Sequence, residues 1–240
     1  MRIGCFNKIR FGLSLIGSLL LLSGAAGRTS ETPSLTEIVQ RIQKVYDQTG
    51  DLSADFAQVS TLKSLAVGGP TGGQQEQRAS GRVRIKKPGM IRWDYTKPES
   101  QVLLSDGKIL WRYAAAEKVA YKDDLFSAGK TPLSFLTGTG KIDEEFKARP
   151  LSEKENANPN LYVVELLPKE PLPAVERLSL EVDRGNYWIK KVSFWDPFGN
   201  KTTLEFSNIR FNVGLSSSLF RFTPPSGVQV ESLQGISMWR

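Results

Sequence analysis

Histidine is absent from the 240-residue chain, and cysteine occurs once, as Cys5. These absences exclude a mature Ser-His-Asp or Cys-His nucleophile and a zinc site built from the usual nitrogen and sulfur ligands. Carboxylates or a Ser-Lys pair remain as catalytic candidates. Asp106 falls in a predicted turn and the Asp94 side chain alternates outward, so both are better explained as solvated surface residues. A hydrolase that uses carboxylates such as Asp94, Asp106, Asp123 or Asp124 is therefore disfavoured. We expect no enzyme activity, metal or cofactor.

The first 27 residues have the pattern of a secretion signal. Three basic and no acidic side chains occur in the first ten residues, an apolar run follows at 11–22, and small residues occupy 23–27. The run is shorter than the roughly 20 residues that a spanning helix needs. We therefore predict cleavage near Arg28, which would remove Cys5 and leave no thiol, disulfide or lipid-anchoring cysteine.

The charge of the chain does not indicate a nucleic-acid partner. The net charge is +7, and it falls to +4 without the three basic residues of the signal. Lys and Arg are interleaved with Asp and Glu along the rest of the sequence, whereas nucleic-acid binding usually requires clustered basic residues. Residues 28–240 are sufficient for one substantial core, so we predict a single domain.

An amphipathic helix is predicted to follow Ser34. Ser34 and Glu37 have the spacing of a capping box, and Gly50 would end the helix. Apolar residues recur at steps of three and four and form one stripe: Leu35, Ile38, Val39, Ile42, Val45 and Tyr46. The stripe is compatible with a fixed cover on a core and with a movable lid.

Alternation of polar and apolar residues predicts antiparallel strands through most of the remaining chain. Asp106-Gly107 lies between two alternating runs, which is a strong hairpin signal. The Gly- and Gln-rich segment 66–80 is predicted to be a mobile hairpin loop, and 131–136 to be a short helical turn with Pro132 at its first position. About ten strands without βαβ alternation indicate one antiparallel sheet, strongly curved or rolled into a barrel.

Large aromatic side chains gather on the predicted strand faces. The run 90–95 alternates Ile91, Trp93 and Tyr95 with Arg92 and Asp94, which predicts one apolar face. A second apolar face is predicted in 108–113. The two faces could be a normal packed core or the lining of a hollow apolar cavity that encloses a ligand. The candidate cavity residues are Ile91, Trp93, Tyr95, Ile109, Trp111 and Tyr113.

Five motifs, in order along the chain, resemble the LolA family. They are SADFAQ at 53–58, GRVRIKKPGMIRWDY at 81–95, SDGKILWRY at 105–113, TPL at 131–133 and FRFTPPSGV at 220–228. Each motif alone is modest, but their ordered sum is fairly specific. The resemblance implies a mainly β fold: an unclosed antiparallel barrel of about 11 strands, covered by short helices that form a lid.

The resemblance also implies a function. Members of the family are periplasmic carriers of Gram-negative-type bacteria, and they hold the acyl chains of lipoproteins in a hydrophobic cavity. The implied partners are the lipoprotein cargo, an inner-membrane ABC-type releasing complex and an outer-membrane lipoprotein receptor, with the carrier itself a monomer. The alternative is a lipid- or lipoprotein-sensing regulatory module with the same fold, although such regulators usually carry a second domain.

The resemblance finally implies residues for the lid and for its closure. In the family, an arginine before the proline that ends the second strand typically bonds to carbonyls of the lid; here the position is Lys87. Lysine supplies the charge of arginine without its planar fork. Lys87 could close the lid, be replaced in that role by Arg84 or Arg92, or be a solvated edge lysine. The expected lid residues are Leu35, Ile38, Val39, Ile42, Leu133, Phe135 and Leu136.

Overall fold

The computed structural model describes residues 33–63, 74–124, 131–150, 158–172 and 175–232, which belong to one compact unit beginning at Pro33. The predicted secretion signal lies outside the described residues. The helices are α1 (Leu35–Asp47), α2 (Ser134–Thr137), α3 (Ile142–Glu145) and the 3-10 helix η2 (Ser217–Phe220). The strands are β1 (Asp51–Lys63), β2 (Gln74–Lys86), β3 (Met90–Lys97), β4 (Gln101–Ser105), β5 (Leu110–Ala114), β6 (Val119–Asp123), β7 (Phe146–Pro150), β8 (Leu161–Pro168), β9 (Arg177–Asp183), β10 (Ile189–Trp195), β11 (Lys201–Phe211) and β12 (Gln229–Ser232).

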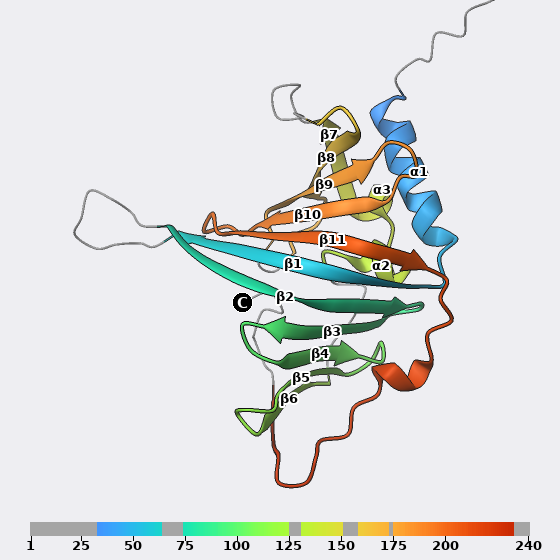
Figure 1. Cartoon of the computed structure of the whole chain (residues 1–240). Helices are drawn as coiled ribbons and strands as arrows, with labels where there is room; N and C mark the ends of the chain where they lie inside the picture. Colours follow the sequence, from blue (N-terminus) through green and yellow to red (C-terminus); the bar gives the residue numbers. More distant parts are fainter. Residues whose placement is uncertain (1–32, 64–73, 125–130, 151–157, 173–174, 233–240) are drawn as a thin grey trace, which may run out of the picture. The chain divides into compact units, whose positions relative to one another are not determined.

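The described strands form one sheet of twelve, in the order β12-β6-β5-β4-β3-β2-β1-β11-β10-β9-β8-β7 (Figure 1). Neighbouring strands are antiparallel except β12, which pairs in parallel with β6. The sheet ends in two edges, β12 and β7, and is therefore unclosed. The predicted fold class is confirmed, with twelve strands in place of about 11.

The second strand begins inside the segment 66–80, which the sequence pattern predicted to be a loop. β1 and β2 pair from Asp51↔Lys86 to Lys63↔Gln74. The expectation of a loop throughout 66–80 is therefore wrong for its second half, where β2 begins at Gln74. Ladder hydrogen bonds to β1 satisfy the backbone of this polar segment, although its composition is typical of a loop. Residues 64–73 lie outside the described ranges.

The sheet has two faces, which we call the inner and outer face. Directly paired residues of neighbouring strands share a face, so the register places Phe56, Val83 and Trp93 on the inner face of one half of the sheet and Leu180 and Leu204 on that of the other half. All five belong to a single buried core cluster. The sheet therefore bends around one core on its inner face.

Helix α1 forms where the sequence predicted it. The Ser34 hydroxyl accepts a hydrogen bond from the Glu37 amide at 3.3 Å, and the Glu37 carboxylate accepts one from the Ser34 amide at 2.8 Å. This capping box satisfies two amides that the first turn would otherwise leave without partners. The helix packs against α2, α3 and β7 (Figure 1).

The chain after β11 crosses to the outer face. The buried carboxylate of Asp51 accepts hydrogen bonds from the amides of Val213, Gly214 and Leu215, and directs the chain out of the strand. The Lys86 ammonium then donates to the carbonyl of Leu215 at 2.7 Å. Further along, η2 contacts β3, and β12 completes the edge beside β6.

Candidate functional site

The inner face of β1–β3 carries an aromatic cluster. Trp93 and Tyr95 are buried, and both make edge contacts with Phe56, with ring centroids 4.8 and 5.0 Å apart. The Tyr95 hydroxyl donates to the Gln58 side-chain carbonyl at 3.1 Å, and burial raises the pKa of Tyr95 to about 12. Ile91 is buried on the same face. The structure therefore brings three of the predicted cavity residues together.

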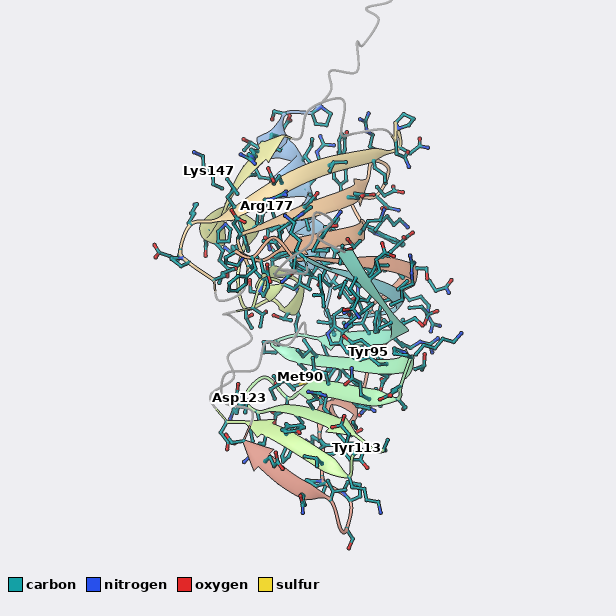
Figure 2. All side chains as sticks on the ribbon, turned by 90° about the vertical axis from the view of Figure 1, so that its left-hand side faces the viewer. Met90, Tyr95, Tyr113, Asp123, Lys147 and Arg177 are labelled. Carbon is teal, nitrogen blue, oxygen red and sulfur yellow. The ribbon has the colours of Figure 1, made fainter. Side chains whose placement is uncertain are left out.

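The prediction that Trp111 and Tyr113 share this wall is wrong. Trp93 pairs with Leu103, and Leu103 pairs with Arg112, so Arg112 lies on the inner face. Because alternate residues of a strand share a face, the inner face of β5 carries Leu110, Arg112 and Ala114. Trp111 and Tyr113 point to the outer face, where both rings pack against Phe222 at 5.3 Å between centroids. Ile109 is half-exposed and precedes β5. Figure 2 shows Tyr95 and Tyr113 on the part of the sheet formed by β3–β6.

The described residues of the inner face form one buried core. A small apolar cavity of about 20 Å³ remains between the end of α1, α2 and the sheet. This volume is close to the smallest that holds one water molecule, roughly 10–15 Å³, and is far too small for an acyl chain. Its lining includes Tyr46, Leu52, Ala54, Val83, Ile85, Trp93, Leu136, Ile189, Phe206 and Ile209.

The residues that fill the inner face include the expected lid residues. Ile38, Val39 and Ile42 of α1 are buried, and Leu35 is half-buried against the same core. The segment 133–136, which contains the start of α2, contributes buried Leu133, Phe135 and Leu136. The ring of Phe135 meets that of Tyr46 edge-on, with centroids 6.5 Å apart. Both helices therefore cover the inner face with apolar side chains.

Lys87 connects the sheet to the lid. It directly follows β2, and its ammonium donates a hydrogen bond to the carbonyl of Tyr46 in the last turn of α1. Burial lowers the pKa of Lys87, and the nearby Asp47 carboxylate opposes this shift. By contrast, Arg84 and Arg92 point to the outer face and bind Asp94.

Two further contacts that hold α1 were not predicted from the sequence. The buried amide side chain of Gln43 accepts a hydrogen bond from the Ile142 amide of α3 at 2.8 Å and donates one to Asp47 at 2.8 Å. The Tyr46 hydroxyl accepts from the Ile189 amide of β10 at 3.0 Å, and burial raises the pKa of Tyr46. Gln43 lies beside the apolar stripe in the sequence, and its pattern gave no signal of the first contact.

The disfavoured catalytic carboxylates do not converge on a site. Asp94 is held by Arg84 and Arg92, Asp106 caps its own turn by accepting from the amides of Lys108 and Ile109, and Asp124 pairs with Lys122 at 2.7 Å. Within the described ranges, no three His, Cys, Asp or Glu side chains are grouped to hold a metal ion. Among the same residues, no helix has the length and apolar character needed to cross a membrane.

Comparison with known proteins agrees with these features. Residues 47–223 match the model of the family "Outer membrane lipoprotein carrier protein LolA". The chain is 30% identical to an outer-membrane lipoprotein carrier protein of Chromobacterium violaceum, over 89% of this chain and 96% of the relative. It is also 30% identical to the protein of the same name in Methylococcus capsulatus, over 88% and 93%.

A solved structure of an uncharacterized conserved protein from Thermus thermophilus shares the fold, with a TM-score of 0.50 and 13% identity over 83% of this chain and 99% of the other. The match to the family model spans most of the described chain, and the two curated relatives are covered almost completely. The chain therefore belongs to the LolA family of outer membrane lipoprotein carrier proteins.

Proposed function

We propose that this protein carries lipoproteins across the periplasm by shielding their acyl chains against the inner face of its sheet. The names of its curated relatives support the cargo. The observation that carries the proposal is the apolar inner face, which two helices cover and a few polar contacts close. The helices cover the inner face in the described residues, and the apolar cavity of about 20 Å³ beneath them is too small for an acyl chain.

Binding and closure compete for the same apolar surface. A buried methylene is worth about 0.8 kcal/mol, so an acyl chain with about fourteen methylenes gains ~11 kcal/mol when it is shielded from water. The four buried apolar side chains of α1 are Ile38, Val39, Ile42 and Tyr46. Displacing them costs ~6–12 kcal/mol at about 1.5–3 kcal/mol each. Because the two terms are comparable, cargo can displace the lid and later be released without a large net change.

The route of the cargo follows from the same proposal. We infer that the carrier is exported with a signal at residues 1–27, which is then cleaved, receives lipoproteins from an inner-membrane ABC-type releasing complex and delivers them to an outer-membrane receptor. A receptor needs only a somewhat higher affinity for the acyl chains, since the closing lid replaces them on the inner face. No catalytic step is required. The named relatives do not favour the alternative of a sensing module.

Mass spectrometry of the protein purified from the periplasm without detergent tests the proposal. We expect part of the population to carry a lipoprotein or a diacylated fragment, and the mature protein to begin near Arg28. Addition of the purified carrier to membranes that contain the releasing complex should bring lipoproteins into the soluble fraction. A carrier that is always lipid-free and releases no lipoprotein would contradict the proposal.

Substitution of Ile91 tests the proposed acyl-binding wall. Ile91→Glu places a charge on the buried inner face, whereas Met90→Glu places it on the half-exposed outer face of the same strand. Ile91→Glu should abolish lipoprotein release and destabilise the closed state, because a charge without a partner is costly to bury. Met90→Glu should retain release. Circular dichroism would identify conditions in which both variants are folded, and equal release under those conditions would place the acyl site elsewhere.

A further inference from the structure

A basic pocket lies on the outer face, at the end of β1 that is remote from Lys87. Its volume is about 540 Å³, and its lining contains three cations, Lys63, Arg177 and Lys201, against one carboxylate, Glu176. β1 runs from Asp51, beside the lid, to Lys63, beside the pocket, over 13 residues. At about 3.3 Å per residue, this separates the two sites by ~40 Å. The pocket is therefore distinct from the proposed acyl site.

Two cations of this pocket, Arg177 and Lys201, are held in place. Trp195 pairs with Arg177 on one side and with Lys201 on the other, so all three side chains share the outer face. The Arg177 guanidinium lies 3.7 Å from the centroid of the Trp195 ring, and the Lys201 ammonium lies 4.9 Å from it. Arg177 also donates a hydrogen bond at 2.9 Å to Glu165, whose side chain is only 2% exposed. Figure 2 shows Arg177 on the part of the sheet formed by β7–β10.

A rigid turn presents an apolar ring beside the pocket. Phe198 precedes Gly199, which lines the pocket, and is 72% exposed. The Asp196 carboxylate accepts hydrogen bonds from the amides of Phe198 and Asn200, both at 2.9 Å. The Asn200 side chain in turn accepts one from the Lys63 amide at 2.8 Å. The turn between β10 and β11 is thus fixed to the end of β1, at the end of the sheet away from α1 (Figure 1).

We propose that Phe198 and the cations of this pocket form a contact site for anionic lipid surfaces. The pocket would receive lipid phosphate groups, and the ring of Phe198 would enter the interfacial layer. Aromatic rings favour that layer, and Lys and Arg are attracted to anionic lipids. An acidic protein segment would bind the cations but would not require an exposed aromatic ring. The exposed ring on a fixed turn, flanked by cations, therefore indicates a lipid surface as the partner.

Such a contact is weak and reversible. Each cation near an anionic surface strengthens binding about fivefold, and insertion of a phenylalanine ring strengthens it about tenfold or more. These gains in membrane affinity are smaller than those of a stable anchor, which requires two strong membrane signals. The site would hold the carrier near either membrane for a short time and leave the lid end free to meet a protein partner.

Co-sedimentation with lipid vesicles tests the proposal, using protein purified from the periplasm. We expect binding to phosphatidylcholine vesicles that contain phosphatidylglycerol, little binding to phosphatidylcholine alone, and weaker binding as salt is added. Phe198→Ser should lower the affinity about tenfold, and Lys201→Glu should lower it more than fivefold. Equal binding to both kinds of vesicle, or unchanged binding by both variants, would overturn the proposal.

Matched controls distinguish binding at this site from non-specific vesicle binding and from effects on the acyl site. Val230→Ser removes another exposed apolar side chain, 52% exposed on β12, and Lys108→Glu makes the same charge change in an exposed turn. Both controls should retain vesicle binding. Phe198→Ser and Lys201→Glu should bind an apolar fluorescent probe in solution with the affinity of the wild type, since they leave the inner face and Lys87 unchanged. Absence of vesicle binding by the wild-type protein would exclude the lipid site and leave an acidic protein as the partner.

Discussion

The ammonium group of Lys87 donates a hydrogen bond to the main-chain carbonyl of Tyr46. The donor directly follows β2, and the acceptor lies in the last turn of α1. The aliphatic part of Lys87 also lies against Gly138, which ends α2 in a left-handed conformation; a Cβ at Gly138 would be 2.6 Å from Cδ of Lys87. One side chain thus contacts both helices that cover the inner face.

The first prediction concerns closure by Lys87. Lys87→Leu should shift the lid toward the open state and raise the affinity for an apolar fluorescent probe about tenfold, because a hydrogen bond from a charged donor is worth about 1.5–3 kcal/mol. Lys87→Arg should retain the donor and keep probe affinity low. Lys86→Leu is the control, since Lys86 donates to a carbonyl on the outer face. Equal probe affinity in all variants would show that Lys87 does not hold the lid.

The second prediction concerns the contact between α1 and α3. Gln43→Leu has a similar size but leaves the Ile142 amide without its acceptor, so the closed state should lose about 1–3 kcal/mol. Hydrogen exchange at the Ile142 amide should accelerate accordingly, and probe binding should rise. Gln40→Leu, on the exposed side of the same helix, should change neither quantity. An unchanged exchange rate in Gln43→Leu would contradict a role for Gln43 in closure.

The third prediction separates the two faces of the sheet. Trp93→Ala should impair lipoprotein release as well as stability, because Trp93 lies in the inner core and borders the cavity. Trp111→Ala should lose about 1–3 kcal/mol of stability through its contact with Phe222 and should release lipoproteins normally while folded. Chemical denaturation and the release assay measure the two effects. A specific loss of release in Trp111→Ala would return Trp111 to the acyl-binding wall.

The fourth prediction concerns Glu165 and pH. The hydrogen bond from Arg149, together with that from Arg177, holds the pKa of Glu165 below its ordinary value of 4.5 against the opposing effect of burial. The stability that its ionised form contributes is therefore present above about pH 4.5 and is lost as the pH falls through the lower folded-state pKa.

At pH 7, Glu165→Gln should accordingly have a free energy of unfolding about 1–3 kcal/mol below that of the wild type, and should unfold at a lower denaturant concentration. This difference in the free energy of unfolding should shrink in acid. Glu181→Gln, which removes a half-exposed ion pair with Lys191, should have the smaller effect. A difference between wild type and Glu165→Gln that stays constant into acid would show that the carboxylate is not ionised in the folded protein.

The sequence was sufficient to predict relations within one element but not between elements. Alternation placed Ile91, Trp93 and Tyr95 on one face because a strand has a period of two. The face of Trp111 depends on the register of the β4–β5 hairpin, where Ser105 pairs with Leu110. A shift of one residue would have placed Trp111 on the inner face, and the Asp-Gly turn signal does not determine the register.

Some contacts that close the lid could not be predicted from the sequence, because they join residues that are far apart in the chain. The apolar stripe of α1 predicted which side is buried, and the family resemblance directed attention to Lys87. Gln43 and its partner Ile142 are 99 residues apart in the chain. A polar side chain beside an apolar stripe is ordinarily exposed, and only the position of α3 against α1 gives Gln43 a buried partner.

The two edges of the sheet have a consequence for behaviour at high concentration. An exposed edge strand offers unpaired N–H and C=O groups to a second copy of the chain. Here β12 has only four residues, all exposed and including Glu231, and β7 has five, including Arg149 and Pro150, which has no N–H. Short, charged or proline-containing edges are poor templates for strand addition. The protein can therefore keep a large open sheet without polymerising edge to edge.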